Sequence, residues 1–448
     1  MYKLKLITRY LLKRRITHFA ILAVALCVFI VVVVMTIMTG LVEDFKQKNH
    51  LFVGDCVVGT DSLVGFPYYE EFIEVLKGTD FVEAVSPAVK SYGLLSVREY
   101  EVRRGVEILG IDPVLHARTT DFGQTLHYRA NQPDKAFQPV YDPNALGCVL
   151  GIDLALNRSA QGQYMYDARP SEVAITLTCF PLTAKGAPAK VGAGLVETQR
   201  FYYSDHSQSG IAHIDGSQVY IPLEQAQKLC MAGTLKRVNA IHIKFCSGVG
   251  LSQGRGRVAA LWQEFKRTKA DAQDSFLLDA VQVQDWKEYR RAYIAPMEKE
   301  QVLLSLMFIL VGITTVFIVF VVFYMIVSHK RKDIGVLKSV GSSQVSILVL
   351  FSGFAFMIGC LGSGIGALTA WLFLSKINWV EGRLFEWFGF QLWDRSIYAI
   401  GDIPNHVEFR VLATIVGCAI LSCLVGALFP AYSAARLRPV ETLHTGPV

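Results

Sequence analysis

Four long stretches without a charged residue divide this chain, and they set the first constraint on its fold. The stretches are 19–42, 301–328, 339–375 and 411–435, with 24, 28, 37 and 25 residues. A hydrocarbon core of ~30 Å is crossed by about 20 helical residues, each rising ~1.5 Å. Each stretch is therefore predicted to span a membrane, with the first turns of the third at the interface.

The charges between these spans are sorted by sign. If the spans alternate, segments 1–18, 329–338 and 436–448 share one side, and they carry twelve basic and two acidic residues, a net charge of +10. The whole chain carries only +6. Cytoplasmic segments are rich in Lys and Arg, so both termini are expected in the cytoplasm. Anionic lipid accounts for this basic excess, and no nucleic-acid partner is expected.

The N-terminal basic segment and apolar run are expected to form an uncleaved span, because the run is too long for a signal-peptide core. The predicted fold is an α-helical membrane protein with four transmembrane helices and a large α+β extracytoplasmic domain between the first and second. The expected parts are a cytoplasmic start 1–18, spans 19–42, 301–328, 344–375 and 411–435, an outer domain with stalk 43–300, a cytoplasmic segment 329–343, an outer loop 376–410 and a tail 436–448.

The outer segment has the patterns of a folded α+β domain. Residues 67–77 place Tyr69, Phe72, Ile73 and Leu76 at the spacing of an amphipathic helix. Further helices are predicted at 258–269 and 286–303, and β-rich runs occur at 85–97, 105–111, 172–179, 218–222 and 238–245.

Segment 286–303 is predicted to be one helix that runs into the second span. Trp286, Tyr289, Tyr293 and Met297 lie on one of its faces, and Pro296 is its only expected kink. Periodicity alone fits a surface helix as well as a lever. Continuity with the membrane favours the lever.

Several motifs of enzyme active sites are absent from the sequence. The chain has no Gly-Lys dipeptide and hence no P-loop, and it has no HExxH or SxxK motif. Catalytic residues are therefore not assigned, and any ATP and Mg would be bound by a partner chain. No span holds an acid, a Lys or an Arg, which argues against ion-coupled transport.

An Asp/His cluster is a candidate metal site, and the outer cysteines are candidates for disulfides. Asp205, His206, His213 and Asp215 cluster in a Ser/Gly-rich stretch, and we expect a solvated loop there and no metal or cofactor site. No CxxC motif occurs, and the pairing of the five outer cysteines is left open; these are Cys56, Cys148, Cys179, Cys230 and Cys246.

The third span contains a GxxxG motif at Gly362 and Gly366. Such glycines let two helix backbones approach closely. Packing within this chain is the favoured interpretation, and a dimer face is the alternative.

The layout of one span, a large outer domain and three further spans resembles the MacB/FtsX-like permeases of ABC transporters. Two motifs support this resemblance. Residues 330–341 (KRKDIGVLKSVG) are similar to the family's cytoplasmic KxxEIGxLKAxG segment, with Asp333 and Ser339 departing from the usual Glu and Ala. Residues 430–443 (PAYSAARLRPVETL) are similar to its PAxxAARLxPVExLR ending.

The resemblance implies that segment 330–341 couples the permease to an ATPase. Its Lys330 to Lys332 run could contact lipid phosphates, and Ile334 and Leu337 were expected to present an apolar face to the cytoplasm. The predicted coupling residues are Lys330, Lys332, Asp333, Ile334, Gly335, Leu337, Lys338 and Gly341.

Within this family, segments 9–11, 105–113 and 219–227 look most like the lipoprotein-releasing (LolC/LolE) branch. In that branch a proline-bounded hook captures a periplasmic carrier. Pro181, Leu182 and Pro188 belong to a turn-rich loop that lies where such a hook would fall.

The resemblance implies a non-enzymatic permease of the bacterial inner membrane that transmits force from ATP hydrolysis to the periplasm. The expected partners are a P-loop ATPase, a second copy or a paralogue, a lipoprotein substrate and a periplasmic carrier. MacB-like efflux and FtsX-like control of a cell-wall hydrolase are alternatives with the same mechanics. A membrane sensor with an outer ligand domain is an alternative of another class.

Overall fold

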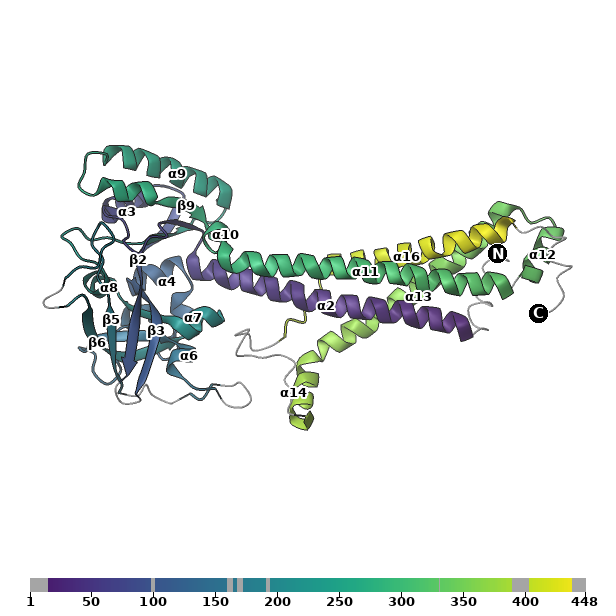
Figure 1. Cartoon of the computed structure of the whole chain (residues 1–448), viewed down its shortest axis with the longest axis horizontal. Helices are drawn as coiled ribbons and strands as arrows, with labels where there is room; N and C mark the ends of the chain where they lie inside the picture. Colours follow the sequence, from purple (N-terminus) through teal and green to yellow (C-terminus); the bar gives the residue numbers. More distant parts are fainter. Residues whose placement is uncertain are drawn as a thin grey trace. The chain divides into compact units, whose positions relative to one another are not determined.

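The computed structural model describes residues 15–97, 101–158, 164–166, 172–190, 194–329, 331–388 and 403–436. The chain forms two compact units, whose elements are labelled in Figure 1. The membrane unit consists of Met1–Glu43, Pro296–Leu392 and Asp402–Val448. The strand-rich unit consists of Asp44–Ala295 and Trp393–Gly401.

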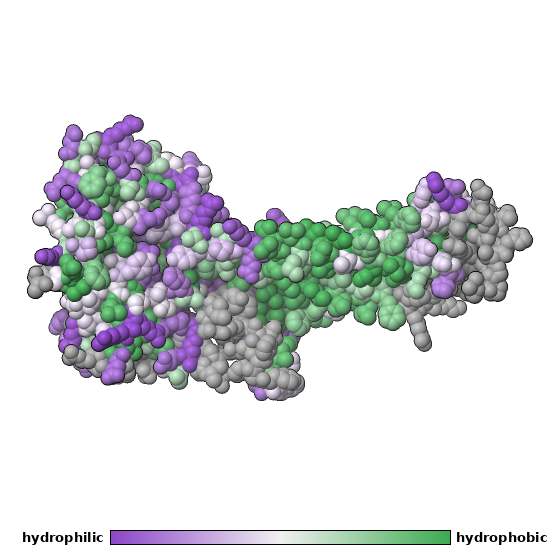
Figure 2. Space-filling view, in the orientation of Figure 1, coloured by the Kyte–Doolittle hydropathy of each residue, from purple (hydrophilic) through white to green (hydrophobic). Residues whose placement is uncertain are grey.

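Four helices are long and apolar enough to cross a membrane. Their most apolar windows have mean hydropathies between 2.3 and 3.2. Helical folding satisfies their backbone polar groups internally, which a hydrocarbon environment requires. Figure 2 shows hydrophobic residues over the visible face of these helices. They are α2 (Arg15–Val53), α11 (Arg291–His329), α13 (Gln344–Ser375) and α16 (Phe409–Arg436).

Glycines bring α13 close to α2. A Cβ on Gly362 would lie 2.8 Å from Val24 Cβ, and one on Gly366 would lie 2.5 Å from Ala25 O. Real Cβ atoms do not approach that closely, so neither position has room for a side chain. The GxxxG motif is therefore used for packing within this chain.

Two shorter helices complete the described part of the membrane unit. Helix α12 (Arg331–Ser339) lies between α11 and α13 in the sequence. Helix α14 (Ile377–Phe388) follows α13, in a region expected only as a loop. Gly341, with φ of 97°, ends the α12 segment in the left-handed region that glycine favours.

The strand-rich unit is built on a nine-stranded sheet of order β3-β7-β4-β6-β5-β2-β8-β1-β9. An additional β2–β3 pairing closes six of these strands, β2, β3, β7, β4, β6 and β5, into a ring. The strands are β1 (Cys56–Gly59), β2 (Val82–Val97), β3 (Val102–Ile111), β4 (Gly147–Gly151), β5 (Ala174–Cys179), β6 (Glu197–Ser207), β7 (Gln218–Pro222), β8 (Ala240–Phe245) and β9 (Gln282–Asp285).

The long strand β2 makes this closure possible. Its residues Val82 to Ala88 pair with β8, whereas residues 88–97 pair with β3 and residues 93–97 also pair with β5. The described helices of the unit are α3 (Tyr69–Lys77), α4 (Pro113–Thr119), α5 (Phe122–Thr125), α6 (Ile152–Ala155), α7 (Ala212–Ser217), α8 (Leu223–Cys230), α9 (Leu251–Thr268) and α10 (Trp286–Tyr289), with 3-10 turns at Pro133–Lys135 and Ser275–Ala280.

The core of this unit confirms the predicted amphipathic helix. Tyr69, Phe72, Ile73 and Leu76 of α3 are all buried. The ring of Trp262 on α9 packs edge-on against Phe72, with centroids 4.8 Å apart. The predicted fold, four membrane helices with an α+β domain between the first and second, is confirmed.

Gly366 allows a sharp test of the α13–α2 contact. We expect Gly366→Leu to destabilise the protein by about 1–3 kcal/mol, because overpacking forces shifts in a close-packed interior. Gly364, two residues away with no atom within 4 Å of its added Cβ, supplies the control Gly364→Leu. Thermal unfolding of both variants in detergent measures the effect. Equal midpoints would contradict the packing.

Candidate functional site: the α12 segment, the helix junction and the Pro181–Pro188 loop

The predicted coupling residues fall on and around α12. Lys330, and the side chains of Lys332, Asp333 and Leu337, lie outside the part that the structure describes. Ile334 is only 2% exposed, so the expectation that it faces the cytoplasm is wrong. Among the side chains of this segment that the structure describes, the exposed apolar ones are Val336 on α12, at 52%, and Val340 just after it, at 82%. These two are four residues apart.

Helical spacing explains why Ile334 and Val336 differ. Residues that are two positions apart on a helix face nearly opposite directions, whereas residues four positions apart share a face. Ile334 and Gly335 are buried within the membrane unit, so Val336 points outward. Among its described side chains, the motif therefore exposes Val336 and Val340, while Ile334 packs inside the membrane unit.

Lys338 joins the two sequence motifs. Its Nζ donates a hydrogen bond of 2.6 Å to the backbone carbonyl of Ala435, in the last turn of α16. A cation near the carboxyl end of a helix is stabilised by the unpaired carbonyls and the helix dipole. This partly buried hydrogen bond links the 330–341 motif to the start of the C-terminal motif. The sequence contained both motifs but no sign of this pairing.

The predicted single helix over 286–303 is broken. Helix α10 ends at Tyr289, Arg290 has φ of −96° and ψ of 13°, and α11 begins at Arg291. Arg290 is 6% exposed, and its Nε donates to Asn49 Oδ1 on α2 at 2.7 Å. Its guanidinium also lies 4.3 Å from the centre of the Tyr293 ring. The helix is therefore broken at the buried Arg290, whereas Pro296 lies inside α11.

Further contacts at this helix junction fix the carboxyl end of α2. The rings of His50 and Trp286 stack with centroids 4.8 Å apart. His242 Nδ1 on β8 donates to the backbone carbonyl of Val53 at 2.8 Å. Asn49 Nδ2 donates to Phe45 O at 2.8 Å, which leaves its Oδ1 to accept from Arg290. Residues 45–53 are therefore held on several sides within the strand-rich unit.

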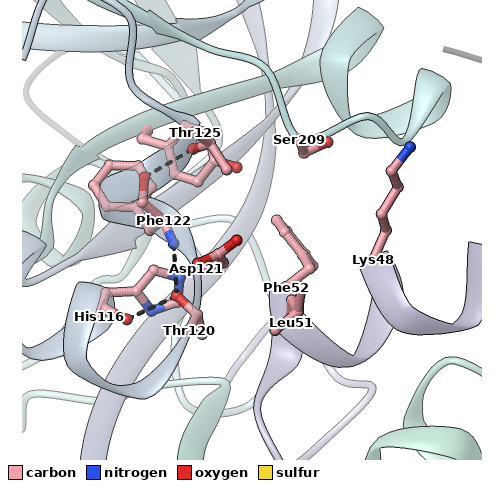
Figure 3. Close-up of a pocket in the computed structure, with 10 residues that line it drawn as sticks. Lys48, Leu51, Phe52, His116, Thr120, Asp121, Phe122, Thr125 and Ser209 are labelled. Carbon is pink, nitrogen blue, oxygen red and sulfur yellow. Dashed lines mark hydrogen bonds between the residues drawn. The ribbon is translucent and has the colours of Figure 1, made fainter. Parts of the chain in front are cut away.

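A small cavity lies beside this junction, and Figure 3 shows the residues that line it. Its volume is about 40 Å³, close to that of one water molecule, so it cannot take an organic ligand. Asp121 N donates to Leu51 O at 2.9 Å next to it. The cavity is lined by Lys48, Leu51, Phe52, His116, Thr120, Asp121, Phe122, Thr125, Ser209 and Tyr220.

The Pro181–Pro188 loop is a tight turn with an anchored base. Leu182 N donates to Cys230 O at 3.0 Å, and Arg237 Nη2 donates to Leu182 O at 2.7 Å. Pro181 is buried, whereas Pro188 is exposed with the rest of the tip, Lys185 to Ala187. Gly186, with φ of 80°, makes the turn. Only the tip can contact another molecule.

The Asp/His cluster is not a solvated loop, and that expectation is wrong. Asp205 and His206 lie in β6 and are fully buried. Asp205 accepts hydrogen bonds from the backbone nitrogens of Tyr128 and Arg129 at 2.9 and 2.8 Å. Asp215 accepts from Ser209 and Gly210. Within the described ranges, no group of three or more His, Cys, Asp or Glu could hold a metal ion.

A nucleophile-elbow spacing, GxSxG, occurs at 250–254. Ser252 is exposed on the first turn of α9, and no hydrogen bond joins it to a histidine among the described residues. A triad needs a base within hydrogen-bond reach of the nucleophile. The spacing alone therefore supports no hydrolase site.

The membrane unit contains an apolar groove between α2, α11 and α16. Its volume is about 460 Å³. Val28, Val316 and Ile415 line it, one from each helix, and its few polar atoms come from residues such as Ser305 and Ser422. Such a lining favours an alkyl chain over a polar solute.

Arg290 is the first junction residue to test. We expect Arg290→Ala to lower the free energy of unfolding by about 2–3 kcal/mol, because it leaves Asn49 Oδ1 unpaired and removes the ring contact. The adjacent Arg291 is exposed, and Arg291→Ala should change that free energy by less than about 0.5 kcal/mol. Denaturant unfolding of the full chain in detergent compares them. A similar loss in both variants would rule out the junction.

His242 predicts a pH dependence. Burial lowers its pKa to about 4, so the folded protein keeps it neutral while the unfolded chain protonates near the ordinary value of 6.5. The contribution of His242 to the free energy of unfolding is therefore fully present above about pH 6.5. It decreases by about 3 kcal/mol as the pH falls toward 4.

His242→Asn keeps a donor toward Val53 O but does not titrate. We expect the difference in unfolding free energy between wild type and His242→Asn to shrink by about that amount from pH 7 to pH 4. Groups that do not contact His242 are shared by the two proteins and cancel, whereas the buried His116, whose ring lies 5.4 Å from that of His242, loses a charge partner that lowers its pKa. A constant difference would show that His242 is not kept neutral.

Comparison with known proteins places these features in a family. Residues 305–439 match the model of the FtsX-like permease C-terminal region. The chain is 24% identical over 438 residues, 96% of its length and 94% of the relative's, to the lipoprotein-releasing system transmembrane protein LolC of Neisseria meningitidis serogroup B. LolC of Xylella fastidiosa strain 9a5c is 21% identical over 95% of this chain and 92% of its own length.

Among solved structures, the periplasmic region of MacB from Actinobacillus actinomycetemcomitans aligns with 55% of this chain and 97% of its own, at 12% identity and a TM-score of 0.30. The family region contains the 330–341 motif and the start of the 430–443 motif. The resemblance stated from these motifs is confirmed. Residues 305–439 are thus similar to the C-terminal region of FtsX-like permeases, and LolC proteins are distant relatives along nearly the whole length of the chain.

Proposed function

We propose that this chain is the permease subunit of an ABC transporter that extracts lipoproteins from the inner membrane and passes them to a periplasmic carrier. The observation that carries this proposal is the similarity to LolC over 96% of the chain, including the strand-rich unit. A partner chain would bind ATP and Mg and hydrolyse the nucleotide. This chain would bind no cofactor of its own.

The topology follows the charges. The basic segments 1–18 and 329–338 would lie in the cytoplasm with the tail, and the strand-rich unit would lie in the periplasm. Helix α12 then faces the ATPase. Val336 and Val340 give it an exposed apolar pair that a groove on the partner would bury.

Movement of α12 would be passed on through links that the structure contains. Lys338 ties α12 to the end of α16, and α11 ends at His329, two residues before α12 begins. Helices α2 and α11 each have 39 residues and continue past their uncharged stretches, to Val53 and from Arg291. Motion would therefore be carried along these helices.

A lipid-anchored substrate fits the groove between α2, α11 and α16. Each buried methylene contributes about 0.8 kcal/mol to membrane anchoring, so release of several acyl chains without work is slow. An apolar groove of about 460 Å³ could shelter part of such a chain during extraction. A second copy or a paralogue would complete the path, and the exposed tip of the Pro181–Pro188 loop would contact the carrier.

The coupling role is tested by adding charge to the exposed face of α12. We expect Val336→Asp and Val340→Asp to abolish co-purification of a P-loop ATPase, because a carboxylate would be buried in the docking groove. Gln344→Asp is the matched control, since Gln344 is exposed at the start of α13 and the change adds the same charge. Mass spectrometry of the chain purified in mild detergent measures the partner.

The other outcomes separate the alternatives. ATPase retained by both valine variants would overturn the coupling assignment. An ATPase accompanied by an adaptor or a cell-wall hydrolase would replace lipoprotein release with efflux or hydrolase control. A folded wild-type preparation without any ATPase would overturn the transporter proposal and leave the sensor.

A further inference from the structure

Helix α14 begins at the level where the apolar part of the membrane unit ends. Asn378 Oδ1 accepts from Ile403 N at 2.9 Å, and the next residue, Pro404, lies against Gly40 of α2. Gly40 is three residues before Glu43, the first acid after the apolar run of α2. The same depth is marked by a 3.5 Å hydrogen bond from Gln301 Nε2 on α11 to Thr39 Oγ1.

The helix does not continue the span that precedes it. Helix α13 ends at Ser375, and Lys376, with φ of −117° and ψ of 6°, separates it from α14. Figure 1 shows α14 turned away from the direction of the neighbouring long helices. The twelve described residues of α14 rise ~18 Å, less than the ~30 Å of a hydrocarbon core. Helix α14 therefore leaves the bundle sideways near the membrane surface.

The two faces of α14 differ in burial. Ile377 and Glu381, four residues apart, are only 8% and 6% exposed. Trp379 and Trp387, eight residues apart, are 63% and 74% exposed. Arg383 lies midway between these tryptophans, with its guanidinium 5.7 Å from the centre of the Trp379 ring. One face of the helix thus packs on the unit, and the other presents two indoles and an arginine.

Exposed tryptophans at this depth are expected to contact the boundary between lipid headgroups and acyl chains. Indole rings concentrate at the boundary between lipid headgroups and acyl chains, where the ring is in apolar surroundings and its N–H reaches polar atoms. Two exposed indoles in water would leave a large apolar area hydrated. The helix that precedes α14 in the sequence, α13, is long and apolar enough to cross a membrane.

We propose that α14 is an in-plane membrane anchor, with Trp379 and Trp387 inserted at the headgroup–acyl boundary of the leaflet in which α13 ends. Arg383 lies between them and contacts lipid phosphate or glycerol oxygens. Because Arg383 Nη1 is also paired with Glu386 at 2.9 Å, the anchor does not depend on anionic lipid. It fixes the depth of the α13 end and, through Asn378 and Ile403, that of the segment before α16.

The test uses the full chain in phosphatidylcholine nanodiscs, with phosphatidylcholine brominated either near the headgroup end or near the methyl end of its acyl chains. Bromine quenches tryptophan fluorescence on contact. Subtracting the emission of Trp379→Phe or Trp387→Phe from that of wild type isolates each indole. We expect both to be quenched more by the shallow bromines than by the deep ones, with no change when phosphatidylglycerol is added.

Trp371 on α13 is the matched control. It is 55% exposed and lies five residues, or ~7.5 Å, before Lys376, so deep bromines should quench it more than they quench the α14 indoles. If Trp379 and Trp387 are quenched by aqueous acrylamide and not by bromolipid, α14 lies in water and the proposal fails. Protection from both quenchers would mean that a protein covers this face, which also overturns it. Neither result depends on an ATPase partner.

Discussion

The absence of hydrogen-bond partners in the hydrocarbon core is the constraint on which the rest of this molecule depends. It requires each span to be a helix, and it removes the hydrophobic drive for one span to associate with another. Close contact must then come from shape. Gly362 and Gly366 supply it on α13, where an added Cβ would overlap α2, and Gly426 does the same between α16 and α11, with Val316 O at 2.6 Å.

Polar side chains near the helix ends make several of the specific connections between elements. Lys338 caps the carbonyls at the end of α16, Arg290 binds Asn49 at the end of α2, and Asn378 binds Ile403 beside the end of α13. Only the first of these satisfies a backbone carbonyl in the last turn of a helix. The other two connect side chains near helix ends to segments distant in the sequence.

Much of the architecture could be predicted from the sequence, because both periodicity and charge are local signals. The spans, α3 with its Tyr69–Leu76 face, and most of the longer strands fall into this class. Strands β1 and β4 have only four and five residues and are buried throughout, so they show no alternation. Strand β6 has polar residues whose burial depends on partners distant in sequence, such as Tyr128 for Asp205.

The candidate sites were harder to predict, because their geometry also depends on contacts between residues that are distant in the sequence. The motif at 330–341 identifies the segment, but which of its apolar residues is exposed depends on how α12 packs on its own unit. The prediction that Ile334 is exposed was therefore wrong. The bend at Arg290 is likewise invisible locally, since an arginine is a good helix former and only its burial against Asn49 ends α10.

The exposed apolar groups outside the long spans fit the proposed force-transmitting subunit. Val336 on α12, Val340 just after it, and Trp379 and Trp387 on α14 are exposed at opposite ends of the membrane unit. If α12 binds an ATPase and α14 is anchored in the bilayer, as proposed, the subunit would be held at a fixed depth while it is pushed from one side. Displacement of α12 would then be carried along the helices instead of being lost as vertical movement of the whole subunit.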